Sequence, residues 1–205
     1  MARRNDHSRE EIKKMAIKAG RAIIAREGIH GFSARKTARE IGYSVGTLYN
    51  VFTDYDDFMM HINAVTLDEL YSYVTEKGGE VGAVPAAGGG TLAVLGMRYI
   101  AFAENNRHVW EALFSYVRPP DKNMTPEYRE KIGRLFALIE EELRPFLGDK
   151  ADSRTAQMIW AGVHGVCALG ISGKLCFEEE ADHAKETREA AQRLLAVCMK
   201  GAAAA

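Results

Sequence analysis

Apolar side chains recur at three- and four-residue spacing along most of the chain, and this periodicity constrains the fold more than any other sequence feature. The first stretch shows it plainly, because Ile12, Ala16 and Ile23 fall on one face of a helix. Ser8 and Glu11 precede that face with the spacing of a capping box. The sequence contains no Asn-Gly or Asp-Gly hairpin turn and no sustained alternation of polar and apolar residues, which strands would need. It therefore predicts an all-α fold.

Two short helices are expected near the N-terminus, and their boundaries follow from the residues that cap them. Ser33 and Ser44 are the predicted N-caps, and Gly42 lies in the turn between the two helices, where glycine can adopt a positive φ. Thr125 and Pro126 mark the start of a later helix as its N-cap and first residue. The predicted helices cover residues 8–27, 33–40, 44–51, 54–77, 91–104, 106–117, 125–147, 152–176 and 181–200.

A glycine-rich segment and a change of charge divide the chain. Residues 78–90 hold six glycines and one proline, so they are predicted to form a linker or loop instead of a helix. Residues 1–54 carry eleven Lys/Arg and six Asp/Glu, a balance of +5, whereas residues 55–205 have a balance of −6. We expect a basic head at 1–54, a connecting helix at 55–77 and a body at 91–205. Charge alone leaves two interpretations open: the head is a docking face for a polyanion, or the solvated helix faces simply vary in charge.

Several classes of protein are excluded by what the sequence lacks. The three cysteines have neither metal nor disulfide-framework spacing and the histidines are scattered singly, so no metal site and no cofactor are predicted. No nucleophile with a base, carboxylate pair or phosphate-binding glycine loop has convincing spacing, so the chain is not expected to be an enzyme. The first residues contain no apolar stretch that could form a signal peptide, which favours a cytoplasmic protein. The apolar run at 158–172 is too short to span a membrane, and no membrane partner is expected.

The helices predicted at 33–40 and 44–51 have the layout of a helix-turn-helix, whose second helix enters the major groove of DNA. Hydroxyl and amide groups on the second helix can meet phosphate oxygens and base edges, and small residues beside them leave room for close approach. Short capped helices with a glycine turn also occur in ordinary bundles. Leu48 and Phe52 are expected in the core because of their apolar character. The candidate DNA-binding residues are Arg35, Lys36, Ser44, Val45, Gly46, Thr47, Tyr49 and Asn50.

Residues 32–52, FSARKTAREIGYSVGTLYNVF, closely resemble the DNA-binding signature of the tetracycline-repressor (TetR) family of bacterial transcriptional regulators. The most specific part of the match is the SxGTLYxxF core at 44–52, and the likeness extends over roughly residues 8–70. It implies a homodimer whose two heads each place residues 44–51 in the major groove of a palindromic double-stranded DNA operator. By position, Ser44, Thr47 and Tyr49 match family residues that contact DNA.

Two positions depart from the family pattern. Val51 stands where the family commonly has Tyr or His, and it offers no hydrogen bond to a phosphate. Tyr55 stands where the family commonly has Lys, so it stays a candidate DNA contact through its hydroxyl but carries no charge. We therefore expect fewer ionic phosphate contacts, and a shallower fall of DNA affinity with salt, than is usual in the family.

The body contains a run from Met158 to Ser172 that is almost entirely apolar or small, as in a helix buried on all sides. One face of it carries Gly162, Gly165 or Val166, Leu169 and Gly173 at helical spacing, which suits a close subunit interface. The sequence WAGVHG at 160–165 resembles the Trp-His-Gly (WHG) motif of one C-terminal subclass of the TetR family. That resemblance implies that the helices predicted at 152–176 and 181–200 pack against their copies as a four-helix dimer interface.

The remaining helices of the body are rich in bulky apolar residues, which occur in plain cores and in binding pockets alike. The family resemblance favours a pocket for a small-molecule effector, expected to be hydrophobic or aromatic because the surrounding side chains are uncharged. His164 is the one basic group of its run, and it suits either a pocket or a neutral histidine bonded to a backbone carbonyl. The candidate ligand-binding residues are Met97, Phe102, Trp110, Phe114, Trp160 and His164.

The sequence therefore predicts a DNA-binding transcriptional regulator, a repressor that binds its operator as a homodimer and is released by a small molecule. The alternative is a ligand-binding or protein-interaction helical dimer without sequence-specific DNA binding. A preferred DNA sequence would distinguish the two.

Overall fold

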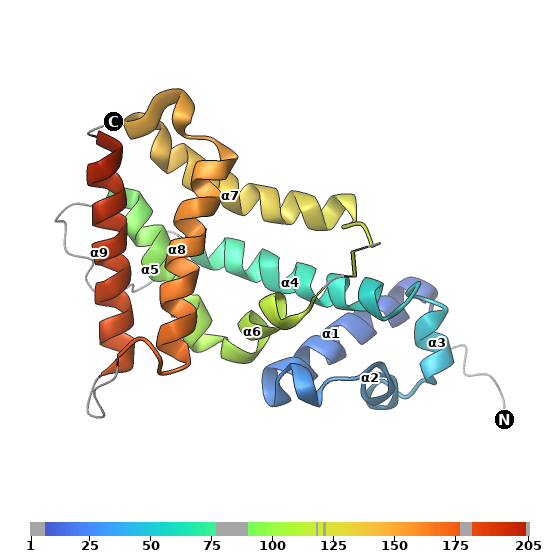
Figure 1. Ribbon diagram of the computed structural model, residues 1–205. Coiled ribbons are helices and arrows are strands. Elements are labelled where there is room, and N and C mark those ends of the chain that lie inside the picture. The colour runs from blue at the N-terminus through green and yellow to red at the C-terminus, as the bar shows by residue number, and fades with distance from the viewer. Residues whose placement is uncertain (1–6, 77–89, 118, 121, 177–181, 204–205) are drawn as a thin grey trace. The chain divides into compact units, whose positions relative to one another are not determined.

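The computed structural model describes residues 7–76, 90–117, 119–120, 122–176 and 182–203, and every regular element in these ranges is a helix (Figure 1). The all-α prediction is confirmed. Most of the predicted glycine-rich loop at 78–90 lies outside the described residues. The α-helices are α1 (Arg9–Glu27), α2 (Ala34–Glu40), α3 (Val45–Tyr49), α4 (Tyr55–Thr75), α5 (Gly90–Asn105), α6 (Arg107–Ser115), α7 (Pro126–Leu147), α8 (Ser153–Ile171) and α9 (His183–Ala203). Two single 3-10 turns accompany them, η1 (Ile29–Gly31) and η2 (Gly148–Lys150).

The predicted helix caps are present. At the start of α1, Ser8 Oγ accepts a hydrogen bond from the Glu11 backbone N–H at 3.2 Å, and the Glu11 carboxylate accepts one from the Ser8 N–H at 2.6 Å. Ser33 Oγ accepts from the Lys36 N–H at 3.1 Å and Ser44 Oγ accepts from the Thr47 N–H at 3.1 Å, so each serine caps its helix through its side chain alone. Thr125 Oγ1 accepts from the Tyr128 N–H at 3.2 Å, directly before α7. Local side-chain chemistry thus determines where these helices begin.

The helix predicted at 152–176 ends earlier than expected. In the structure α8 ends at Ile171, because Gly173 has a φ of +68° and turns the chain out of the helix. The Lys174 N–H donates to the Leu169 carbonyl at 2.8 Å and the Gly173 N–H donates to the Gly170 carbonyl at 3.0 Å. These two bonds form a Schellman motif, which satisfies the last carbonyls of the helix.

The helices form two compact units. Unit 1 comprises residues 1–69 and 106–129, and unit 2 comprises residues 70–105 and 130–205. The helix α4 contributes residues to both units. The domain boundaries expected at 54 and 77 stay a prediction, and the structure adds that α6 belongs to unit 1 with the head helices.

Unit 1 has a core built by α1, α2, α3, α6 and the first part of α4. The helices α1 and α4 cross closely at Gly20, where a Cβ atom would lie 2.7 Å from Ile62 Cδ1. The helix α6 packs on α1, and its His108 Nδ1 donates to the Ala25 carbonyl at 3.0 Å. The main buried side chains are Ile12, Ala16, Ile23, Ile24, Phe32, Ala38, Leu48, Phe52, Phe58, Met59, Ile62, Val109 and Ala112. The prediction that Leu48 and Phe52 belong to the core is confirmed.

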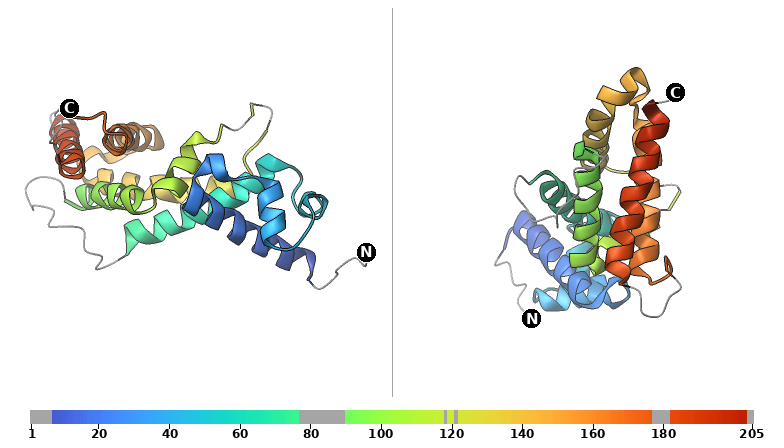
Figure 2. Two further views of the ribbon diagram at one scale, coloured as in Figure 1. Left: turned by 90° about the horizontal axis from the view of Figure 1, so that it is seen from below. Right: turned by 90° about the vertical axis from the view of Figure 1, so that its left-hand side faces the viewer.

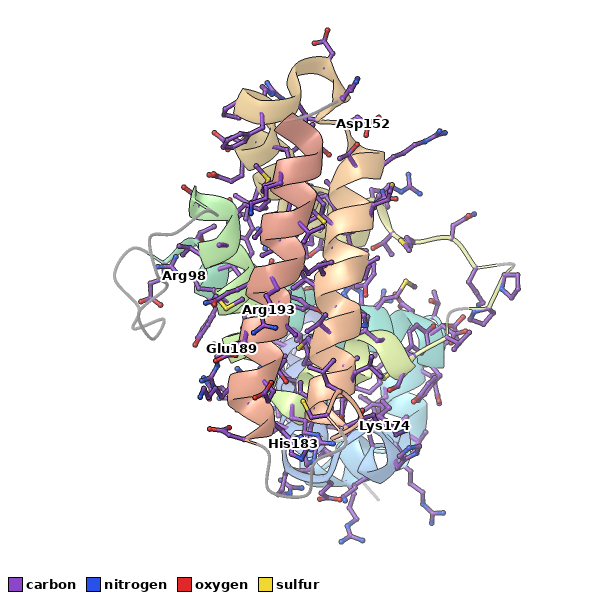
Figure 3. All side chains as sticks on the ribbon, turned by 60° about the vertical axis from the view of Figure 1, so that its left-hand side comes forward. Arg98, Asp152, Lys174, His183, Glu189 and Arg193 are labelled. Atoms are coloured by element: carbon purple, nitrogen blue, oxygen red, sulfur yellow. The ribbon has the colours of Figure 1, made fainter. Side chains whose placement is uncertain are left out.

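In unit 2, α8 and α9 run side by side with α5 against them (Figures 1 and 2). Figure 3 shows that they are antiparallel, because Lys174 just after α8 lies at the same end as His183, the first residue of α9. A Cβ atom on Gly162 would lie 2.9 Å from Leu194 Cδ2, so Gly162 serves the contact between α8 and α9 within one chain. Its expected place in a subunit interface stays a prediction. No helix in the described ranges is long and apolar enough to cross a membrane.

Candidate nucleic-acid interface and aromatic cluster

The turn between α2 and α3 is held by Gly42, whose φ is +76°. The Tyr43 N–H donates to the Ala38 carbonyl at 2.9 Å and the Gly42 N–H donates to the Arg39 carbonyl at 3.2 Å. This is a Schellman motif with glycine in the left-handed position, as the sequence indicated. The Tyr43 hydroxyl is also within 2.8 Å of His7 Nδ1, which connects the turn to the residues before α1. The geometry fixes the direction in which α3 leaves α2.

The first turn of α3 presents hydroxyl groups that are already organised. Ser44 Oγ accepts from the Thr47 backbone N–H at 3.1 Å and lies 2.9 Å from Thr47 Oγ1. Both bonds lie on the exposed side of the helix. The two hydroxyls are therefore held in one orientation before any partner approaches.

The end of α3 and the start of α4 expose two tyrosines. Tyr49 is 44% exposed and Tyr55 is 39% exposed. Burial raises the pKa of Tyr55, with smaller contributions in the same direction from Asp56 and from Tyr49, so the two tyrosines lie near one another. Val51, the first departure from the family pattern, is buried in the core. The sequence-predicted contacts Tyr49 and Tyr55 thus share one surface region.

Gly46 is exposed and has open space where a side chain would stand. A Cβ atom there would meet Ser44 Oγ at 3.6 Å, which is ordinary van der Waals contact. The protein itself therefore imposes no steric need for glycine at this position. Asn50 beside it is exposed as the C-cap of α3, whereas Val45 is half-buried and packs against the core.

The two basic candidates on α2 differ in what they contact. Arg35 is exposed, and it forms no ion pair with any residue that the structure describes. The Lys36 ammonium pairs with the Glu27 carboxylate at the end of α1 and lies 3.5 Å from the Gly31 carbonyl. Lys36 would have to leave these partners to reach a phosphate, so Arg35 is the better placed of the two.

Sequence reasoning missed the contacts that hold the first turn of α4. Asp54 Oδ1 accepts from the Asp57 N–H at 2.9 Å, and the Asp54 carboxylate also pairs with the Lys122 ammonium. The Tyr116 hydroxyl donates to Asp56 Oδ1 at 2.8 Å. The hydrogen bond from Lys122 is the main cause that lowers the pKa of Asp54, and burial followed by Asp56 raises the pKa of Tyr116. The segment after α6 therefore holds both neighbours of Tyr55.

The predicted ligand-binding residues fall into two groups. Trp110 and Phe114 lie on α6 in unit 1, with their ring centroids 5.3 Å apart in an edge-to-face arrangement. Met97 and Phe102 lie on α5 in unit 2, and both are buried. Trp160 and His164 lie on α8 in unit 2, so the structure brings together the two residues of the WHG-like motif. A ligand role for the six residues stays a prediction.

An aromatic cluster surrounds His164 in unit 2. Its imidazole stacks on Trp160 at a centroid distance of 5.1 Å, and Phe136 of α7 meets Trp160 edge-on at 5.7 Å. His164 Nδ1 lies 2.7 Å from the hydroxyl of Tyr99 on α5. One of the two sequence-based expectations was a bond to a backbone carbonyl, and this partner is a side chain instead. Burial lowers the pKa of His164, so the ring is neutral at pH 7. The bulky apolar residues of these helices in the sequence included Tyr99 and Phe136. Their spacing did not indicate that the two side chains contact the pair of Trp160 and His164.

One face of α8 and α9 leaves apolar side chains uncovered within the chain. Met158 on α8 is 75% exposed and Val197 on α9 is 69% exposed, with Leu169 also exposed farther along α8. On α8, a Cβ built on Gly165 would point into open space, with no side chain or neighbouring helix of the described residues within 4 Å. Exposed apolar groups along paired helices are typical of a protein–protein interface. Across the described ranges, no group of three or more His, Cys, Asp or Glu side chains is arranged to hold a metal ion.

Comparison with known proteins gives one family and a consistent fold. The family model described as "Tetracyclin repressor-like, C-terminal domain" matches residues 92–198, just over half of the chain. No curated protein matches the chain.

Solved structures resemble the chain over nearly its full length. A protein with unknown function from Rhodococcus sp. RHA1 has a TM-score of 0.66 at 18% identity, with 95% of this chain and 97% of that chain covered. A transcriptional regulator from Rhodococcus sp. Rha1 has a TM-score of 0.60 at 17% identity, covering 92% and 96%. The fatty acid degradation regulator FadR from Bacillus halodurans has a TM-score of 0.57 at 18% identity, covering 89% and 97%. At these identities the likeness shows a shared fold.

Proposed function

The chain belongs to the TetR family of DNA-binding transcriptional regulators, and we propose that it is a cytoplasmic homodimer that represses transcription from a palindromic operator until a small molecule releases it. The proposed role is regulatory and involves no catalytic step. The observation that carries it is the helix-turn-helix of α2 and α3, in which Gly42 sets the turn and Ser44 caps the second helix.

The surface of α3 supports sequence-specific DNA binding. Hydroxyls of Ser44 and Thr47 are organised and exposed, and the Tyr49 ring stands out from the core beside Tyr55. Hydroxyl donors of this kind bind phosphate oxygens and base edges, and the open space at Gly46 allows the helix backbone to approach the bases. Arg35 on α2 supplies a nearby positive charge for the DNA backbone. We assign the DNA-binding role to these residues.

The exposed apolar residues on α8 and α9 support the proposed homodimer. Burying Met158 and Val197 against a second copy removes apolar surface from water, and the open position at Gly165 permits close helix packing. Two heads held in this way read two half-sites about 34–36 Å apart on one face of DNA. A palindromic operator matches the two-fold symmetry of such a dimer.

The effector site is assigned to the aromatic cluster in unit 2. Stacked, uncharged rings at Trp160 and His164 suit a planar or apolar ligand without a net charge. Tyr99 and Phe136 join the assigned residues because they contact this pair directly. Release requires that the effector bind better to the conformation in which the heads no longer match the operator. The helix α4 is the proposed lever, because it begins beside α3 and continues into unit 2.

The test is selection of bound sequences from a random duplex library by the purified protein, with Tyr49→Ala as the control. The proposal expects enrichment of a palindrome that the control fails to enrich. If the folded, dimeric protein enriches no sequence, the interpretation as a protein-interaction dimer without specific DNA binding replaces it.

A further inference from the structure

The helix α3 has little of its own to hold it in place within unit 1. It is five residues long, and Leu48 is the one of them that is buried, with Val45 half-buried beside it. Isolated helices shorter than about 12–15 residues are marginal in water, so α3 depends on contacts with its surroundings. Contacts at its two ends therefore have a large share in setting its orientation.

The start of α3 is bonded to the residue that precedes the N-cap of α1. Tyr43 stands directly before Ser44, the N-cap of α3, and its hydroxyl lies 2.8 Å from His7 Nδ1. The two rings also meet edge-on, with their centroids 6.2 Å apart. The Tyr43 ring packs against the core of unit 1, so its hydroxyl has a defined position. The bond thus joins the turn before α3 to a residue thirty-six positions earlier in the sequence.

The start of α1 gives His7 a fixed base. The backbone N–H of Ser8, in the peptide group that follows His7, donates to the Glu11 carboxylate at 2.6 Å. One turn further on, Ile12 and Ala16 anchor α1 in the core. His7 therefore extends from a backbone that the capping box already holds, and its ring can transmit that order to α3.

The other end of α3 is contacted from the same turn of α1. Arg9 Nη2 donates to the Val51 carbonyl at 3.4 Å, a longer hydrogen bond than the contact at Tyr43. Val51 is the second residue after α3, and its side chain is buried in the core. The beginning of α1 therefore contacts the chain just before α3 and just after it.

We propose that His7 is a positioning residue for DNA recognition, which acts through Tyr43 on the orientation of α3, with Arg9 supporting the opposite end. The inference rests on the proposed function, because it assumes that α3 reads base edges. Hydrogen bonds to base edges need aligned donors and acceptors, whereas phosphate contacts carry no sequence information. Without His7, the protein loses affinity for its operator and keeps its affinity for unrelated duplex DNA.

The first test needs no DNA. Hydrogen exchange of the full-length protein is compared for His7→Ala, Tyr43→Phe and the unmodified chain. Each variant lacks the bond between the two side chains, so amides at 44–51 should exchange about fivefold faster. His30→Ala changes another exposed histidine of unit 1, and it is the control that should leave this exchange unchanged. Unchanged exchange at 44–51 in His7→Ala and Tyr43→Phe overturns the proposal.

The second test measures affinity for the selected palindrome and for a duplex of unrelated sequence. His7→Ala and Tyr43→Phe should each bind the palindrome about fivefold more weakly and the unrelated duplex equally well. Because both remove the same bond, the double variant should bind no more weakly than either single variant. His7→Asn should restore the affinity, since its amide places a polar atom near the position of Nδ1 without adding charge.

Two results of the DNA measurements would overturn the role of His7. An equal loss on both duplexes, or no recovery in His7→Asn, would mean that His7 contacts a phosphate itself. Equal affinity of all variants for the palindrome would leave the regulator standing without this role. Failure of the unmodified protein to select any palindrome is a different outcome, because it removes the proposed function while the exchange experiment still reports on the contact between His7 and Tyr43.

Discussion

The hydroxyl of Tyr116 donates a 2.8 Å hydrogen bond to Asp56 Oδ1, which ties the segment after α6 to the first turn of α4. Lys122 reinforces this tie through its ion pair with Asp54. Tyr55 stands between the two aspartates, so its position depends on residues more than sixty positions away in the sequence. A change in the segment after α6 would therefore alter the position of Tyr55 on the surface assigned to DNA binding.

Tyr116→Phe removes this hydrogen bond and keeps the ring. We expect the free energy of unfolding to fall by about 1 kcal/mol, because Asp56 exchanges a protein donor for water. Operator affinity should fall by a few-fold at the same time, because the first turn of α4 is held less firmly. Tyr73→Phe, which alters a tyrosine hydroxyl in unit 2, is the control and should leave operator affinity unchanged. Urea unfolding and fluorescence anisotropy measure the two effects.

Gly46→Ala distinguishes an effect on protein stability from an effect on DNA binding. The added methyl group would make only ordinary contact with Ser44 Oγ, and alanine favours a helix over glycine by about 0.5–1 kcal/mol. The variant should therefore be as stable as the unmodified protein or slightly more stable. Operator affinity should nevertheless fall by about tenfold or more, which is at least about 1.4 kcal/mol, because the methyl group occupies the space for the bases. Unchanged affinity would mean that α3 does not approach the bases at Gly46.

The dependence of operator affinity on salt tests the two departures from the family pattern. Val51 is buried and Tyr55 is uncharged, so neither neutralises a phosphate. Tyr55→Lys should steepen the slope of log K against log [salt] by about 0.9 for each head that gains a phosphate contact. The slope of the unmodified protein should be correspondingly shallow. A Tyr55→Lys protein with the original slope would place residue 55 away from the DNA backbone.

The pH dependence of stability tests the burial of His164. Burial lowers its pKa below the ordinary value of 6.5, so the unfolded chain takes up a proton at a higher pH than the folded chain does. The resulting stability is complete above about pH 6.5 and is lost as the pH falls from there toward the folded-state pKa. His164→Gln should flatten this decline, while Gln can still accept from the Tyr99 hydroxyl. The exposed His30→Gln protein is the control, and urea unfolding between pH 5 and 8 measures the difference.

The sequence indicated local features well, because these are decided by neighbouring residues. Ser8, Ser33 and Ser44 cap helices by bonding backbone groups three residues away, and Gly42 supplies a positive φ that other residues avoid. The end of α8 was predicted too late because the prediction followed the apolar run and not the local turn residue. The apolar run predicted a helix that continues past Ser172, whereas Gly173 ends the helix through its own backbone conformation.

The periodicity of apolar residues does not predict which segments far apart in the sequence contact one another. Nothing in the spacing of residues shows that Tyr116 meets Asp56, or that Tyr99 meets His164 across sixty-five positions. The pairing of Lys36 with Glu27 likewise depends on how α1 and α2 pack.

The most direct test of the central claim is the affinity of the protein for its selected palindrome and for the same duplex with one half-site scrambled. A homodimer reading DNA through two α3 helices should bind the palindrome with two chains per duplex, and bind the scrambled duplex at least about a hundredfold more weakly, a loss of about 2.7 kcal/mol. Equal affinity for the two duplexes, or one chain per palindrome, would contradict the account of two linked heads.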